Sequence, residues 1–155
     1  MRVGIGYDSH RFAAGRKLIL GGVRIPHPQG LAGHSDADVV AHALTDAILG
    51  AAGLGDIGRM FPATDPRWRD ANSIGLLSKA YLKVVEAGVT FVHADITIIA
   101  EQPRLAPYSD AMQGKLAEAL VTGLSTMSIK AKTNEGMGFI GRGDGIAAIA
   151  VALLA

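Results

Sequence analysis

The stretch VGIGYDSHRF, residues 3–12, begins as an apolar strand and ends with a carboxylate and an imidazole two positions apart. Side chains two positions apart lie on the same face of a strand, so Asp8 and His10 present an oxygen and a nitrogen together. A third ligand from a helix, such as His42, would complete a zinc site with an open fourth position. By spacing alone, a metal site is the less common explanation of so short a motif. A polar strand end together with an ordinary helix histidine is the more common one.

A second polar group, formed by His34, Ser35, Asp36 and Asp38, precedes His42. Asp38 lies four residues before His42, within reach as a partner that orients the imidazole. Helix capping is the alternative, and it explains Ser35 and Asp36 as candidate N-caps with favourable charge. It does not explain His34.

A third group of polar side chains lies in the glycine-rich stretch KTNEGMGFIGRGDG, residues 132–145. It carries Lys132, Thr133, Glu135 and Arg142. Loops of this composition can present backbone N–H groups and cations to phosphates. A flexible connection is the alternative interpretation.

The elements that must position these residues follow from hydrophobic periodicity and from Gly and Pro boundaries. Their order predicts a single α+β domain, residues 1–155, with a mixed sheet packed against helices. The final apolar run is predicted as a strand, with helix as the alternative, and residues 56–73 as a polar loop. Strands are predicted for residues 1–8, 89–100 and 127–133 and from Ile146, a hairpin for 18–25, and helices for 36–52, 73–87 and 107–122.

Composition narrows the functional class. The 155 residues are 49% hydrophobic, and a net charge of +1 without a basic cluster gives no support for binding nucleic acid or a membrane surface. The absence of cysteine excludes disulfides, zinc–thiolate sites and a cysteine nucleophile, and it fits a reducing, cytoplasmic location. No apolar stretch reaches the roughly 18 residues of a membrane span. The 20 glycines permit close packing between elements or subunits, although a general compositional bias explains them equally well.

Six motifs occur in a fixed order: YDSH, GGVRIP, GHSDADVVAHALTDAILGAAGLGDIG, FPATDP, DITIIAEQPRLAPY and KAKTNEGMGFIGRGDGIA. Together they resemble the 2-C-methyl-D-erythritol 2,4-cyclodiphosphate synthase family over residues 2–154. The resemblance implies a compact α+β homotrimer and a phosphorus–oxygen lyase of the non-mevalonate isoprenoid pathway. Such an enzyme cyclises 4-diphosphocytidyl-2-C-methyl-D-erythritol 2-phosphate and releases CMP, because the 2-phosphate of the substrate attacks the β-phosphorus.

The resemblance also implies roles for individual residues. Asp8, His10 and His42 match the ligands of a divalent metal, usually zinc. The resemblance therefore favours a metal site, whereas the spacing alone did not. A second metal, Mg²⁺ or Mn²⁺, would lie with the diphosphate near Glu135, and His34 and Thr133 match positions that stabilise the transition state. The implied substrate-binding residues are Ser35, Asp56, Ile57, Gly58, Phe61, Pro62, Ala63, Thr64 and Asp65, then Ala100, Glu101, Gln102, Pro103, Arg104, Leu105 and Ala106 in a cytidine pocket from a neighbouring subunit, and Lys132, Asn134, Phe139 and Arg142.

The implied chemistry suits these residue types. Phosphoryl transfer depends on in-line positioning and on positive charge around the phosphate oxygens more than on a protein nucleophile. Two metals act as a clamp, and His34 and Thr133 add directed hydrogen bonds. Two positions depart from the family pattern. Ala63 replaces an Asp of many relatives, so one substrate hydroxyl contact is missing or made by the backbone. Lys132 replaces a Thr of some relatives and suits a phosphate.

Two other functions compete with the synthase. In a metal-dependent phosphohydrolase, water would replace the internal phosphate as nucleophile, and CMP would be released without a cyclic product. A trimeric metal- or isoprenoid-binding module would bind without releasing CMP. The resemblance allows such binding, because a prenyl diphosphate occupies an apolar channel on the three-fold axis of some relatives. Phe139 and Arg142 match positions at the mouth of that channel.

Overall fold

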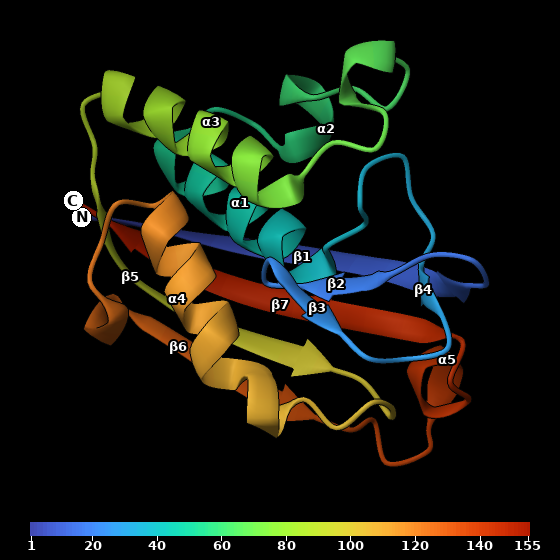
Figure 1. Cartoon of the computed structure of the whole chain (residues 1–155). Helices are drawn as coiled ribbons and strands as arrows, with labels where there is room; N and C mark the ends of the chain where they lie inside the picture. The colour runs from blue at the N-terminus through green and yellow to red at the C-terminus, as the bar shows by residue number, and fades with distance from the viewer.

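A five-stranded sheet with helices on one face forms the framework of the computed structural model, which describes residues 1–155 (Figure 1). The strand order is β4-β1-β7-β5-β6, and a separate hairpin joins β2 to β3. The strands are β1 Arg2–Ala13, β2 Leu18–Leu20, β3 Val23–Ile25, β4 Gly30–Leu31, β5 Phe91–Ile99, β6 Met127–Lys132 and β7 Gly145–Leu154. The helices are α1 Val39–Ala52, α2 Ile57–Met60, α3 Ser73–Glu86, α4 Ser109–Ala119 and α5 Gly138–Gly141, with 3₁₀ turns η1 Pro66–Trp68, η2 Ala106–Tyr108 and η3 Leu124–Thr126.

The sheet is mixed, because β5 and β6 run parallel while the other neighbours are antiparallel. β7 is its central strand and pairs with β1 from Arg2 opposite Leu154 to Arg11 opposite Gly145. The final apolar run is therefore a strand, as predicted, and the helix alternative is wrong. The predicted α+β class is confirmed. None of the helices combines the length and hydrophobicity that a membrane crossing requires.

Helix α1 lies directly on β1, between the sheet and α3 (Figure 1). The contact depends on two glycines of β1. A Cβ at Gly4 would lie 2.0 Å from the carbonyl oxygen of Ala47, and a Cβ at Gly6 would lie 1.9 Å from that of Ala43. Small residues at these positions therefore permit the close packing between elements that the composition suggested. The same contact fixes the distance between the end of β1 and the first turns of α1.

The opposite face of β1 is uncovered in the single chain. Met1, Val3, Ile5 and Tyr7 alternate with the glycines, as predicted, and are 95%, 69%, 69% and 54% exposed. Val151 of β7 pairs with Ile5 and is 41% exposed. The sheet thus buries one apolar face under the helices and leaves a second apolar face bare.

Helix α1 begins later than predicted, and its N-cap is neither Ser35 nor Asp36. Asp38 is the cap, and its carboxylate accepts hydrogen bonds from the amides of Val40 and Ala41 at 3.2 and 3.1 Å. The same buried carboxylate accepts hydrogen bonds from the turn of the β2–β3 hairpin, where Gly21 and Gly22 both have positive φ angles. The side chain of Asp38 is therefore occupied, and the prediction that it orients the imidazole of His42 is wrong.

Other elements also differ from the predictions. β1 continues to Ala13, because residues 2–11 all find partners on β7 and Phe12 and Ala13 pair with β4, a two-residue strand that the sequence did not reveal. The polar loop over 56–73 contains α2 and η1, whose first turns are capped by Asp56 and Asp65. The helix predicted over 107–122 is shorter and is preceded by η2, and the glycine-rich stretch contains α5.

Candidate metal centre and substrate cavity

Asp8, His10 and His42 converge at the end of β1 beside the first turns of α1. Oδ2 of Asp8 lies 2.8 Å from Nε2 of His10 and 3.0 Å from Nδ1 of His42. The two imidazole nitrogens are 3.2 Å apart. The three side chains therefore aim one ligand atom each at a common point, and two imidazoles with one carboxylate form a donor set that zinc accepts.

The hydrogen bonds behind each imidazole fit a metal at that point. Nδ1 of His10 lies 2.6 Å from the carbonyl oxygen of Ala32, which can only accept, so this nitrogen carries the proton and Nε2 is free. Nε2 of His42 lies 2.8 Å from Oγ of Ser73 and 3.2 Å from Oγ of Ser35, which leaves Nδ1 toward Asp8. Each imidazole thus has a hydrogen-bond partner on the side away from the cluster.

The electrostatics of the cluster favour an ionised carboxylate. Burial alone would raise the pKa of Asp8, but hydrogen bonds with His10 and His42 outweigh it and lower this pKa to about 2. Burial would lower the pKa of His10, whereas its hydrogen bond with Asp8 raises this pKa above its ordinary value. Asp8 is therefore a carboxylate at neutral pH, the form that a metal ligand requires.

The cluster opens into a cavity of about 200 Å³ between α1 and the segment that follows it. Eight of its lining residues are among the predicted site residues, and Trp68 and Leu76 are additional. The aromatic ring of Trp68 packs edge-on against Phe61, with centroids 5.0 Å apart. Trp68 is the single tryptophan of the chain and lies in a loop predicted to be polar, which was its one indication in the sequence. The cavity is lined by His10, His34, Ser35, His42, Ile57, Gly58, Phe61, Ala63, Trp68 and Leu76.

Hydrogen bonds to backbone groups hold the 56–73 segment against the cavity. Asp46 of α1 accepts a hydrogen bond from the amide of Ile57 at 2.8 Å, and the carbonyl of His34 accepts one from the amide of Asp70 at 2.8 Å. Nε2 of His34 in turn lies 3.2 Å from the carbonyl oxygen of Asp65. The segment is thus tied to His34 and Asp46, which precede and follow His42 in the sequence.

Several predicted substrate residues of this segment do not line the cavity. The carboxylate of Asp56 caps α2, and that of Asp65 caps η1 and forms an ion pair with Arg67 at 2.7 Å. Pro62 and Thr64 also lie outside the cavity lining, on the part of the loop between α2 and η1.

A second cluster forms where the parallel strands β5 and β6 end. The Glu101 carboxylate accepts hydrogen bonds from the amides of Asn134 and Gly136 at 2.7 and 3.4 Å, and the Lys132 carbonyl accepts one from the Ala100 amide at 2.9 Å. The loop that starts at Ala100 therefore lies beside the glycine-rich loop. The other predicted residues of the first loop are Gln102, Pro103, Arg104, Leu105 and Ala106, of which Leu105 is buried in the core.

Thr133 and Glu135 lie exposed at the tip of this second cluster. The Thr133 hydroxyl donates to Oε1 of Glu135 at 3.1 Å. Glu135 has a φ of 53°, a backbone conformation that residues other than glycine seldom adopt. Strained conformations of this kind concentrate at binding sites, and this one lies in a loop that leaves both side chains exposed.

Phe139 and Arg142 line a cavity of about 650 Å³ together with the end of β1, which includes His10 of the first cluster. Arg142 is paired with Asp144 at 3.0 Å. No hydrogen bond or ion pair joins the Glu101 cluster to the metal ligands or to the 56–65 segment within one chain. The single chain thus presents two clusters of predicted site residues that no hydrogen bond or ion pair connects.

Comparison with known proteins gives a consistent result. The YgbB family model matches residues 1–155. The chain is 58% identical to 2-C-methyl-D-erythritol 2,4-cyclodiphosphate synthase of Moorella thermoacetica over 154 residues, covering 99% of this chain and 94% of the relative. It is 56% identical to the synthase of Symbiobacterium thermophilum over 155 residues, covering 100% of this chain and 99% of the relative.

Solved structures with the same fold include one synthase in a CDP-bound form. It superposes with a TM-score of 0.91 at 40% identity and covers 99% of this chain and 100% of that one. The bifunctional IspDF from Campylobacter jejuni superposes with a TM-score of 0.95 at 46% identity, covering 99% of this chain and 42% of that larger protein.

Proposed function

This chain belongs to the YgbB family, and on that premise we propose that it is a 2-C-methyl-D-erythritol 2,4-cyclodiphosphate synthase, a lyase of the isoprenoid pathway. In the proposed reaction, the 2-phosphate of 4-diphosphocytidyl-2-C-methyl-D-erythritol 2-phosphate attacks the β-phosphorus and CMP leaves. The observation that carries the proposal is the cluster of Asp8, His10 and His42, because it opens into the cavity that contains His34 and Ser35.

Asp8, His10 and His42 are the residues that would hold a divalent metal, zinc being the ion that suits the donor set. A metal bound there supplies positive charge to phosphate oxygens. The chain itself contributes orientation. The carbonyl of Asp65 anchors the imidazole of His34, which, when protonated, has a second N–H to donate to a phosphate oxygen. The attacking phosphate is already an anion, so the reaction requires no strong general base.

Glu135 is assigned to a second cation. A carboxylate beside a diphosphate would be repelled unless a divalent cation neutralised both, and a hard oxygen ligand favours Mg²⁺ or Mn²⁺. Glu135 is exposed and hydrogen-bonded to Thr133, so both groups are available to a substrate that approaches this loop. In this assignment Thr133 donates to a phosphate oxygen, and Lys132 and Asn134 flank it.

The active site is proposed to form between neighbouring copies in a homotrimer. The bare apolar face of β1 and β7 supports this, since apolar surfaces of this kind mark interaction sites. The lack of a connection between the two clusters also supports it, because a neighbour would bring its 100–106 loop to the metal ligands as a cytidine pocket. Phe139 and Arg142 are the residues that would meet a prenyl diphosphate in a central channel.

The test is the release of CMP from the diphosphocytidyl substrate, followed by chromatography with and without divalent metal. We expect release that depends on metal and is lost in His42→Ala, while far-UV circular dichroism shows a retained fold. Release of CMP that is unchanged in His42→Ala or in excess chelator would contradict the proposed site. Binding of the substrate without release of CMP would favour a binding module instead.

A further inference from the structure

The side of His42 that faces away from the metal ligands contacts a buried hydroxyl. Ser73, the first residue of α3, is completely buried, and its Oγ lies 2.8 Å from Nε2 of His42. Ser73 does not cap its own helix, because Asn72 has that role. It lies 31 residues from His42 in the sequence, so its side chain joins the start of α3 to the metal centre.

The direction of the hydrogen bonds follows from Asp36. The Ser73 hydroxyl donates to Oδ1 of Asp36 in a short hydrogen bond, and the Ser73 amide donates to Oδ2 at 3.1 Å. A carboxylate only accepts, so the Ser73 hydroxyl proton points to Asp36 and its lone pairs remain for His42. Nε2 of His42 must then carry the proton, and Nδ1 is left unprotonated toward Asp8 and His10.

Ser35 is the other hydroxyl near this nitrogen, and its geometry is weaker. Its Oγ lies 3.2 Å from Nε2 of His42 and already accepts a hydrogen bond from the amide of Ala37 at 3.2 Å. Ser35 also lines the substrate cavity, whereas Ser73 does not. Ser73 is therefore the better-placed acceptor, and Ser35 remains available to the substrate.

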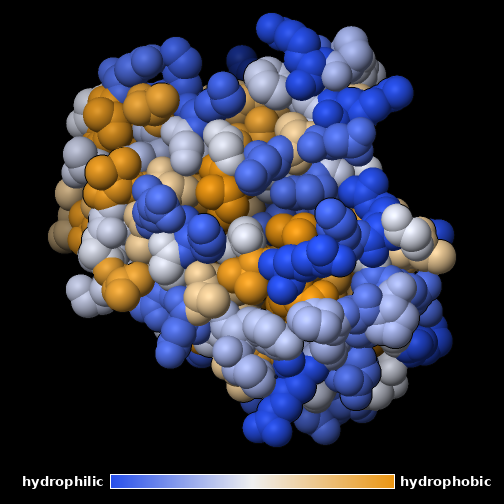
Figure 2. Space-filling model, viewed as in Figure 1, coloured by the Kyte–Doolittle hydropathy of each residue, from blue (hydrophilic) through white to orange (hydrophobic).

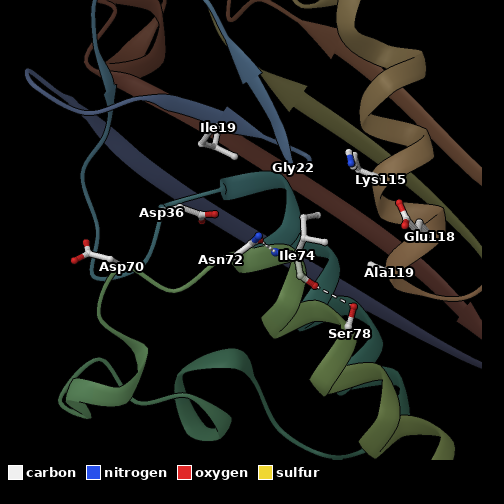
Figure 3. A pocket seen from close by; sticks show the side chains of 10 residues that line it. All are labelled: Ile19, Gly22, Asp36, Asp70, Asn72, Ile74, Ser78, Lys115, Glu118 and Ala119. Atoms are coloured by element: carbon white, nitrogen blue, oxygen red, sulfur yellow. Dashed lines mark hydrogen bonds between the residues drawn. The ribbon is translucent and has the colours of Figure 1, made fainter.

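The position of Asp36 is fixed from several sides. Its amide donates to the carbonyl of Ala71 at 3.1 Å, and its carboxylate also accepts from the amide of Asp38 at 3.1 Å. The same residue lines a groove of about 640 Å³ between the hairpin, α3 and α4, where it lies beside the start of α3 (Figure 3). Figure 2 shows apolar surface framed by hydrophilic side chains between α3 and α4. A continuous set of hydrogen bonds thus runs from this groove to the metal centre.

We propose that Ser73, held by Asp36, is a positioning residue that keeps His42 in the tautomer and orientation in which Nδ1 binds the metal. The inference rests on the proposed metal centre and adds the residues that prepare one of its ligands. Outer partners of metal-bound histidines typically contribute about 10–100-fold to metal affinity. We expect a loss of that size when either member of the Asp36–Ser73 pair is removed.

The experiment is a zinc titration of the full chain against a chromophoric chelator, with five variants, of which His42→Ala tests the metal centre itself. Ser73→Ala and Asp36→Asn should each bind zinc about 10–100-fold more weakly. Ser73→Thr keeps the hydroxyl and should recover most of the affinity. Ser78→Ala is the matched control, because Ser78 lies on the same helix and donates only to the carbonyl of Ile74, so its zinc affinity should equal that of the unmodified chain. In the zinc-bound chain, the Nε2–H proton of His42 should be protected from exchange, and Ser73→Ala should remove that protection.

Each outcome distinguishes the inference from the proposed function. Zinc affinity that is unchanged in His42→Ala would overturn the metal centre itself. If zinc affinity falls in His42→Ala but not in Ser73→Ala or Asp36→Asn, only the proposed role of Ser73 is overturned. Should Ser73→Ala fail to fold by circular dichroism, Asp36→Asn and Ser73→Thr decide the question. Weak binding in Asp36→Asn with recovery in Ser73→Thr supports the inference, and any other combination overturns it.

Discussion

Replacing Gly6 with alanine should damage the fold and the metal centre together. The new Cβ would lie 1.9 Å from the carbonyl oxygen of Ala43, so α1 would have to move about 1.5 Å from β1 to reach an ordinary 3.4 Å contact. Ala43 follows His42, and Gly6 lies two residues before Asp8. The shift would therefore separate two ligand atoms that are 3.0 Å apart.

The expected loss is at the upper end of the cost of overpacking, about 3 kcal/mol, because backbone rather than a flexible side chain must yield. At this chain length, that corresponds to a melting temperature lower by about 6–12 °C. The assay is thermal unfolding at one fixed protein concentration, followed by zinc titration of the folded variant. We expect zinc affinity to fall as well, because the ligands belong to the two elements that move apart.

Gly50→Ala is the matched control. Gly50 lies on α1, the helix that Gly6 contacts, but it is exposed, and a Cβ there meets nothing within 4 Å. The change should stabilise the chain by up to about 1 kcal/mol through helix propensity and leave zinc affinity unchanged. Equal melting temperatures and equal zinc affinities for Gly6→Ala and the unmodified chain would refute the argument that glycine is required for this contact.

Three further predictions follow from other parts of the molecule. Glu135→Gln should raise the Mg²⁺ concentration needed for half-maximal rate while zinc content stays the same, and coincident magnesium titrations would remove Glu135 from the second metal site. The hydrogen bond from Lys130 lowers the pKa of Asp95 against the effect of burial, so this pair stabilises the fold above the unfolded pKa near 3.8 and loses that contribution as pH falls below it. Urea unfolding should show Asp95→Asn less stable than the unmodified chain by under about 1 kcal/mol near pH 7, and the two chains equally stable near pH 2. An equal difference in stability at both pH values would exclude the contribution of this ion pair. Light scattering of the active enzyme should give three times the 16.1 kDa chain mass, whereas an active particle of one chain mass would contradict the shared site.

The main elements could be anticipated because they depend on local patterns. The spacing of Asp8, His10 and His42 did not by itself favour a metal site, which the family resemblance implied. The alternation of side chains along β1 places Asp8 and His10 on one face of the strand. It also places Gly4 and Gly6 on that face. The β-branched residues of the final run indicate a strand, which the sheet confirms. These signals act between neighbours in sequence, where the backbone geometry of a strand or helix is nearly fixed.

The features that escaped prediction depend on contacts between distant segments. Among several acids before α1, only the fold decides that Asp38 caps the helix while Asp36 turns toward Ser73. Ser73 looks like an ordinary helix start in the sequence, and its partner His42 becomes evident only when α3 packs on α1. Trp68 joins the cavity because η1 folds back on Phe61. A two-residue strand such as β4 has no periodicity to detect.

The cyclisation itself is tested most directly by phosphorus NMR of the purified chain incubated with the diphosphocytidyl substrate and Mg²⁺. We predict the two coupled phosphorus signals of the cyclic diphosphate, growing in equal amount with CMP. Release of CMP with an open-chain diphosphate and no cyclic product would show that water is the nucleophile. That result would contradict the proposed synthase activity and make the protein a phosphohydrolase.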